Sequence, residues 1–145
     1  NEVVLKYKPK VVVVYAGDND VAGKIPAEAI GRDFAALVQA IHTALPHTEI
    51  VCLPIKPSRM RWHLWESMKA VNALNKAFAE TYDYVTFVDT ASPLLGAEGL
   101  PTEDLFMKDQ LHLSEKGYAL WNRILAPVLE EKYQKVTDKD NGRGK

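Results

Sequence analysis

Short apolar runs alternate along the chain with longer segments of helical periodicity. Residues 11–15 form a continuous run of β-branched and aromatic residues, bounded by Pro9 and Gly17. Such a run predicts a strand buried on both faces, as in a parallel sheet. Residues 49–53 and 84–88 repeat the pattern and predict two further strands.

Between these strands, apolar residues recur every three or four positions, which is the spacing of an amphipathic helix. The first such segment begins at Pro26 and is stopped by Pro46, and the second runs from about Trp62 to Glu80. Strands that alternate with helices predict right-handed crossovers and a three-layer α/β/α sandwich. Ligands of such folds bind beyond the carboxyl ends of the strands.

The C-terminal region predicts one more helix followed by a tail. Ser114 is the expected N-cap of this helix, with Glu115 in the first turn, and Pro127 should kink or shorten it. Residues 134–145 are polar and contain glycine, so we expect a disordered tail after a single domain at residues 1–133.

Composition narrows the possible partners. Among 145 residues, 18 basic side chains oppose 19 acidic ones, so no basic field favours nucleic acid or an anionic membrane. No apolar run approaches the roughly 20 residues of a membrane span. The one cysteine, Cys52, lies in a predicted strand and is interpreted as a small buried hydrophobe. These residues give no indication of where in or outside the cell the protein resides.

Two short polar motifs carry the candidate chemistry. In DQLH at residues 109–112, Asp109 can orient the imidazole of His112 and leave its other nitrogen as a general base. In GDND at residues 17–20, Gly17 permits a tight turn and Asn19 can donate an amide hydrogen to a developing oxyanion. The alternatives are a helix cap for the first motif and an ordinary polar turn for the second.

Together, these motifs resemble two sequence blocks of the SGNH hydrolases, the GDSL-type lipases and esterases. The phrases VVVYAGDND, IKPSRMRWHLW and DQLHLSEKGYALW resemble a bacterial branch of that superfamily, and the similarity extends from Tyr7 to about Tyr133. The resemblance implies a flavodoxin-like sheet with strand order 2-1-3-4-5, no metal or cofactor, and hydrolysis of a small-molecule ester through an acyl-enzyme.

The resemblance also implies roles for individual residues. His112 would be the general base and Asp109 its orienting carboxylate. Asn19 would supply the oxyanion hole together with Gly17, which shapes the turn, and Asp20 would brace the loop. Short-chain acyl esters and acetylated sugars are the implied substrates.

The sequence departs from the family at the nucleophile. The blocks that would carry the serine and a second oxyanion glycine are not visible, and the four serines, at positions 58, 67, 92 and 114, lack the expected surroundings. We therefore expect the chain to begin at the family's third strand and to be nearly inactive by itself. The strand at residues 11–15 would then be a sheet edge, prone to self-association or dependent on the missing segment for solubility.

A second group of residues follows the second predicted strand. Arg59, Arg61 and Trp62, with Lys56 and Met60 nearby, could line the substrate entrance and bind an anionic or sugar-like group. The alternative is solvated basic side chains beside an aromatic that packs on the sandwich.

Two other functions compete with ester hydrolysis. One is a binding module of the same fold that has lost its chemistry, which the missing serine favours. The other is a metal-dependent phosphoesterase, a weaker interpretation in which Asp18, Asp20, Asp109 and His112 would be the ligands.

Overall fold

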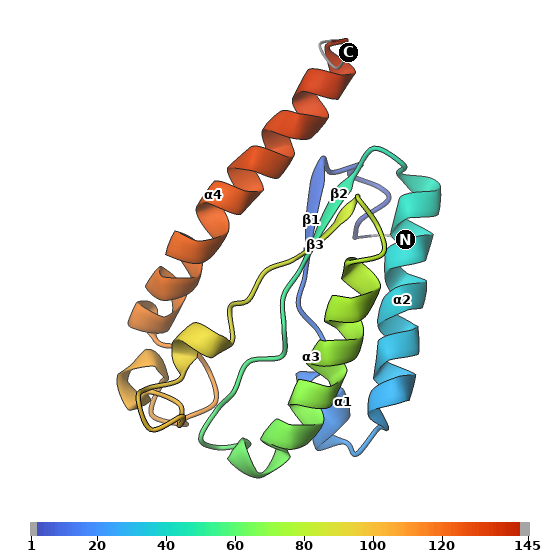
Figure 1. The fold of residues 1–145 in the computed structure, drawn as a ribbon. Helices are drawn as coiled ribbons and strands as arrows, with labels where there is room; N and C mark the ends of the chain where they lie inside the picture. The colour runs from blue at the N-terminus through green and yellow to red at the C-terminus, as the bar shows by residue number, and fades with distance from the viewer. Residues whose placement is uncertain (1–2, 143–145) are drawn as a thin grey trace.

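The computed structural model describes residues 3–142 and contains a parallel sheet between two layers of helix (Figure 1). The strands are β1 (Val11–Val14), β2 (Glu49–Cys52) and β3 (Val85–Phe87), in the order β1-β2-β3. Both pairings are parallel, and Ile50 of the central strand is in register with Val12 on one side and Val85 on the other. The predicted α/β/α fold class is confirmed.

Helices α2 and α3 cover one face of the sheet, and α4 covers the other (Figure 1). The α-helices are α1 (Asp18–Ala22), α2 (Ala27–Ala44), α3 (Trp65–Ala79) and α4 (Glu115–Asp140). Single 3₁₀ turns are η1 (Trp62–Leu64), η2 (Ser92–Leu94) and η3 (Glu103–Leu105). The predicted N-cap of the last helix is confirmed, because the Ser114 hydroxyl accepts a hydrogen bond from the amide of Gly117.

The central strand divides the core between the two faces. Ile50 and Cys52 pack with the side chains of α2, whereas Val51 and Leu53 pack with α4. Because successive side chains of a strand point to opposite faces, a strand covered on both sides needs apolar residues on both faces, as Ile50, Val51 and Cys52 provide in β2. Cys52 is a buried hydrophobe as predicted, and burial raises its pKa to about 12. Among the described residues, no helix is both long and apolar enough to cross a membrane.

Strand β1 is only partly buried, so the prediction of burial on both faces was wrong for it. Val14 is buried, but Val13 is 43% exposed and Tyr15 is 36% exposed. These side chains are exposed because, within residues 3–142, β1 pairs with β2 alone and forms an edge of the sheet.

The free side of β1 follows from its hydrogen bonds. The carbonyl groups of Lys10 and Val14 accept bonds from the amides of Glu49 and Leu53. In a parallel pair, alternate residues bond to the same neighbour, so the backbone groups of Val11 and Val13 face away from β2. An edge strand with outward N–H and C=O groups and apolar side chains is a template for pairing.

We predict that the 145-residue chain self-associates through residues 11–15. Val13→Pro removes an outward-facing N–H group without removing a bond to β2, so it should shift the chain toward monomer. Val13→Thr, which keeps the N–H group, is the matched control. Sedimentation velocity across a range of protein concentrations measures the association, and a strictly monomeric parent chain at high concentration would contradict the prediction.

Helix α4 extends into the segment that was predicted to be a disordered tail. It passes Pro127 without ending there and continues to Asp140, although residues 134–145 were expected to be disordered. The physical reason is that this segment has something to bury: Val136 is 2% exposed, and Lys135 pairs with Glu49 at 2.7 Å. The last three residues of the predicted tail, 143–145, lie outside the described residues.

Glu49 explains why the C-terminal turns of α4 are held. Its side chain is 4% exposed, and one carboxylate oxygen has no hydrogen-bond partner in the structure. Lys139 lies farther from the same carboxylate, at 3.9 Å. A buried carboxylate is costly without a paired cation, so Lys135 fixes the end of α4 against the start of β2.

We predict that Lys135→Ala lowers the free energy of unfolding by about 2 kcal/mol, because it leaves a buried charge with only the distant Lys139. The same substitution in a Glu49→Gln background should cost much less. Lys116→Ala removes an exposed pair with Asp104 and serves as a control expected to cost little, because solvent screens an exposed ion pair. Urea denaturation of the four variants and the parent gives the comparison, and equal losses for Lys135→Ala in both backgrounds would contradict the prediction.

Candidate active site

A cavity of about 250 Å³ lies at the carboxyl ends of the strands and brings the two polar motifs together. Residues from the exits of β1 and β2 meet there with residues from the long loop before α4. Its lining consists of Tyr15, Asp18, Asn19, Lys56, Arg61, Leu111, His112, Leu113, Tyr118 and Trp121. Asn19 and His112, more than ninety positions apart in the sequence, therefore share one cavity.

His112 and Asp109 form a close pair. The Nδ1 atom of His112 lies 2.6 Å from Oδ2 of Asp109, and the other carboxylate oxygen accepts bonds from the amides of Leu111 and His112. Because Nδ1 faces a carboxylate, it carries the hydrogen, and Nε2 is left as the basic nitrogen. The hydrogen bond from the His112 ring is the largest cause that lowers the pKa of Asp109 to about 2.

The loop that holds this pair is short and tightly turned. Phe106 and Leu113 form an antiparallel bridge, and the amide of Met107 donates to the carbonyl of His112 at 2.7 Å. Gln110 closes the turn in the left-handed region, with φ of 55°. The imidazole extends from this turn with 66% of the side chain exposed. Its orientation is therefore set by the Asp109 contacts rather than by burial.

The GDND motif forms the start of a helix rather than the predicted tight turn. Gly17 is the N-cap of α1 with φ of 107°, and a Cβ atom there would lie 2.8 Å from Cδ1 of Ile55. Only glycine fits this combination of left-handed backbone and close packing. Gly17 does not line the cavity of His112 but a second one on the α2 side, so it shapes the backbone behind Asn19.

Arg61 binds the residues that follow Gly17. Its Nη1 atom donates to Oδ1 of Asp18 at 2.6 Å, and its Nη2 atom donates to Oδ1 of Asn19 at 3.0 Å. Lys56 is buried and lies 3.5 Å from the other oxygen of Asp18. Desolvation lowers the pKa of Lys56, and desolvation is also the largest cause that raises the pKa of Tyr15, ahead of the charge of Asp18.

Several predicted site residues lie elsewhere. Arg59 donates to the carbonyl of Pro101, and Trp62 stacks on Trp65 at 6.0 Å, so neither lines the cavity as expected for substrate-binding residues. Trp62 thus packs on a neighbouring aromatic, as the alternative expected, whereas Arg59 is exposed but bound to a backbone carbonyl rather than only solvated. Asp20 is exposed and braces its loop through the backbone, because its carbonyl accepts from the amide of Ile25.

Three aromatic side chains that the sequence did not single out for the site form a wall of the cavity. Tyr15 lies edge-on to Trp121, with ring centroids 5.5 Å apart, and Tyr118 also lies edge-on to Trp121, at 6.5 Å. The indole N–H of Trp121 donates to the carbonyl of Thr90. Their positions in the sequence could have indicated that they line the cavity. Tyr15 ends the first apolar run, and Tyr118 and Trp121 lie in the first turns after Ser114.

None of the four serines lines this cavity. Ser58 is buried and its hydroxyl accepts from the amide of Arg61, while Ser114 caps α4 and donates to the carbonyl of Asp104. Ser67 lies within α3 and Ser92 begins η2. The described residues therefore supply a base, its orienting carboxylate and an amide donor, but no serine beside them.

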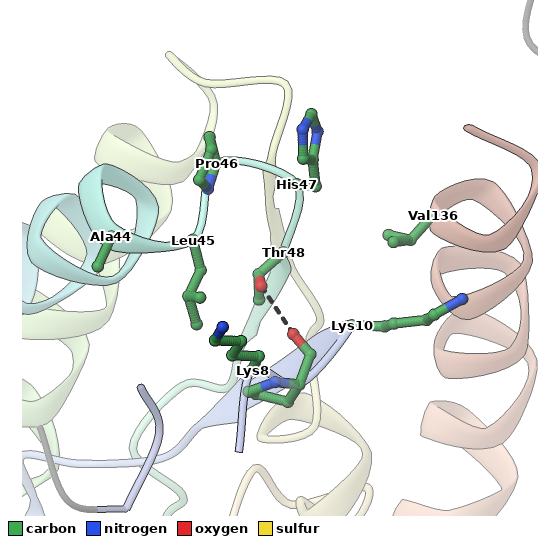
Figure 2. Close-up of a pocket in the computed structure, with 9 residues that line it drawn as sticks. Lys8, Lys10, Ala44, Leu45, Pro46, His47, Thr48 and Val136 are labelled. Atoms are coloured by element: carbon green, nitrogen blue, oxygen red, sulfur yellow. Dashed lines mark hydrogen bonds between the residues drawn. The ribbon is translucent and has the colours of Figure 1, made fainter. Parts of the chain in front are cut away.

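Other hollows are larger but lack a carboxylate–imidazole pair. Figure 2 shows one of about 380 Å³ at the opposite end of the sheet, where Thr48 donates to the carbonyl of Pro9 and Val136 faces from α4. Another, of about 690 Å³, lies between α3 and the exit of β3. Within residues 3–142, no group of three or more carboxylate, imidazole or thiol side chains is arranged to hold a metal ion.

A sequence model of the GDSL-like lipase/acylhydrolase family matches residues 1–120. The chain belongs to this family. Lipases and acylhydrolases are hydrolases, so the chain is part of a hydrolase family. A search of curated proteins found no match.

Solved structures with the same fold include members of this family. A GDSL-like lipase from Bacteroides thetaiotaomicron is 20% identical, with a TM-score of 0.77 over 90% of this chain and 66% of that one. A carbohydrate esterase family 3 protein from Talaromyces cellulolyticus is 22% identical, with a TM-score of 0.75 over 90% of this chain and 62% of that one. The OSK domain of Drosophila Oskar is 15% identical, with a TM-score of 0.65 over 89% and 60%. This GDSL-like chain thus spans about two thirds or less of the length of each.

We predict that the carboxylate of Asp109 titrates with a midpoint of about 2 and that His112→Ala raises this midpoint toward the ordinary value of 3.8. Two backbone amides still donate to the carboxylate in the variant, so the midpoint should stay below 3.8. A lowered pKa means that the paired state contributes stability above the ordinary value and loses it as pH falls through about 2.

The carboxyl ¹³C chemical shift of Asp109, followed from about pH 1.5 to pH 6, measures this midpoint. His63→Ala, which removes an exposed imidazole away from the cavity, is the matched control. An unchanged midpoint in His112→Ala would mean that the ring does not donate to Asp109 in solution.

Proposed function

We propose that this chain carries the acid–base and oxyanion-binding part of a carboxylic-ester hydrolase. The observation that supports the proposal is that the Asp109-paired His112 and the amide of Asn19 line one cavity. A base and a hydrogen-bond donor on either side of a small cavity suit a carbonyl group that is attacked on carbon and becomes negative on oxygen.

In the proposed mechanism, Nε2 of His112 removes the proton from a serine hydroxyl as its oxygen attacks the ester carbonyl carbon. The carbonyl electron pair moves to oxygen, and the Asn19 amide donates to this oxyanion. The intermediate collapses when the carbon–oxygen bond to the alcohol breaks, and His112 returns the proton to the departing alcohol. Water, activated by the same base, then hydrolyses the acyl-enzyme and restores the serine.

The serine in this mechanism is not one of the four in the sequence, because none lies beside His112. In this proposal the serine is supplied by another segment that packs against the cavity. Loss of such a nucleophile typically costs about 10⁶ in turnover. The 145-residue chain by itself should therefore be a poor catalyst.

Small acyl groups suit the cavity best. Its volume of about 250 Å³ is modest, and Tyr15 and Trp121 give it an apolar wall. Esters of short acyl chains, including acetylated sugars, fit this size and polarity. The fold shared with a carbohydrate esterase supports this substrate class.

A catalytically inactive binding module is the second candidate. The absence of a serine among the residues of the cavity favours it, and the OSK domain, which is not named for an enzymatic activity, has the same fold. The two candidates differ in whether His112 accelerates ester cleavage.

The test compares two exposed histidines. The parent chain should hydrolyse 4-nitrophenyl acetate slowly, and His112→Ala should lower the second-order rate constant by about 10- to 100-fold, since general-base catalysis contributes at least this much. His47 lies outside the cavity of His112, so His47→Ala should leave the rate unchanged. This variant controls for unspecific reaction at surface imidazoles.

Equal rates for both variants would contradict the hydrolase proposal and favour the binding module. Fast turnover of the parent chain that a serine-directed phosphonate abolishes would instead contradict the assignment of the serine to another segment.

A further inference from the structure

Arg61 contacts two consecutive residues of the GDND motif. Nη1 donates to the side-chain Oδ1 of Asp18 and also to the backbone carbonyl of the same residue at 3.1 Å. Nη2 donates to Oδ1 of Asn19 at 3.0 Å. One guanidinium group therefore holds the backbone at the start of α1 and the side-chain amide beside it.

The chemistry of the guanidinium decides which end of the Asn19 amide it binds. Arginine has five N–H donors and no acceptor, so only the oxygen of an amide can face it. A flipped amide would place two donor groups against each other and lose the hydrogen bond. With its oxygen facing Arg61, the amide presents its Nδ2 hydrogens on the opposite side.

Arg61 is itself fixed from several directions. Its backbone amide donates to the buried hydroxyl of Ser58 at 3.2 Å, and its partner Asp18 is also contacted by Lys56. The amide of the preceding residue, Met60, donates to the carbonyl of Gln110 at 3.1 Å. The segment at residues 58–61 thus joins the loop of Asn19 to the loop of His112.

We propose that Arg61, paired with Asp18, is a positioning residue that directs the Nδ2 group of Asn19 toward the oxyanion. This inference rests on the proposed hydrolase function and goes beyond it, because it replaces the predicted substrate-binding role of Arg61. Arg61 acts through Asn19 and not on the substrate. Its planar fork is needed because a lysine ammonium could pair with Asp18 but could not also hold the amide in a fixed direction.

Arg59 offers a matched control two positions away. It also donates to a backbone carbonyl, that of Pro101, but it contacts neither Asn19 nor the cavity. Arg59→Met and Arg61→Met therefore remove the same chemical group, and only the second change releases the amide of Asn19.

The experiment measures the side-chain amide of Asn19 by ¹⁵N relaxation in the uniformly labelled 145-residue chain, with Asn19→Ser used to assign the signal. In the parent chain and in Arg59→Met, the order parameter should be near that of rigid backbone, about 0.85. In Arg61→Met it should fall below about 0.6. Arg61→Lys should also lower the order parameter while keeping a positive charge beside Asp18. This variant replaces Arg61→Met in the comparison if Arg61→Met does not fold.

Hydrolysis of 4-nitrophenyl acetate gives a second measurement on the same chains. Arg61→Lys should lower the His112-dependent rate by about tenfold, and Asn19→Ala by about 10²-fold. Arg61→Lys added to Asn19→Ala should lower the rate no further, because a residue that acts through Asn19 has no effect without it. Additive losses would show that Arg61 acts on the substrate directly.

The two measurements separate this inference from the proposed function. An Asn19 amide that is as rigid in Arg61→Lys and Arg61→Met as in Arg59→Met overturns the positioning role, even if the chain hydrolyses the ester. A mobile amide in the Arg61 variants together with no His112-dependent hydrolysis supports the positioning role and contradicts the hydrolase. A fall in melting temperature with no change at Asn19 would assign Arg61 to stability alone.

Discussion

The parallel pairing of β2 with both of its neighbours is the constraint on which the site depends. Parallel strands end at the same edge of a sheet, so the residues that follow β1, β2 and β3 are brought together although the chain separates them widely. Asn19, Arg61 and His112 come from these three exits. The pairing is held by β2, whose residues are buried on both faces and fit only between two layers of helix.

Periodicity predicted the strands, the long helices and the cap at Ser114 because these features depend on local sequence and burial. It predicted the wrong burial for β1 because a run of valines does not reveal whether a partner strand is present. It also missed that α4 continues past Tyr133. That extension depends on Glu49, a polar residue in an apolar strand, which acquires its partner Lys135 only when the fold places the two side by side.

The site could be predicted in part, because one of its contacts also depends on local sequence. Asp109 and His112 are neighbours in sequence, so their spacing alone indicated the contact that the structure contains. Arg59 and Arg61 look equivalent in sequence, but they extend in different directions, one to Pro101 and the other to Asn19. A basic loop beside a cavity does not tell which cation faces the substrate and which supports the site, because that depends on the acceptors that the fold supplies.

The charges around the cavity determine where a reaction could place new charge. Asp18 already neutralises part of the charge of Arg61 and Lys56. In the proposed mechanism, the neutral amide of Asn19 would therefore meet the developing oxyanion. At the other side, His112 would gain a proton and become positive beside the carboxylate of Asp109. Because the hydrogen bond from the His112 ring holds the pKa of that carboxyl well below its usual range, the carboxylate remains ionised beside the ring. New negative and new positive charge would therefore arise at separate positions, each next to a group already oriented to stabilise it, and the cost of reorganising the site during the reaction would be small.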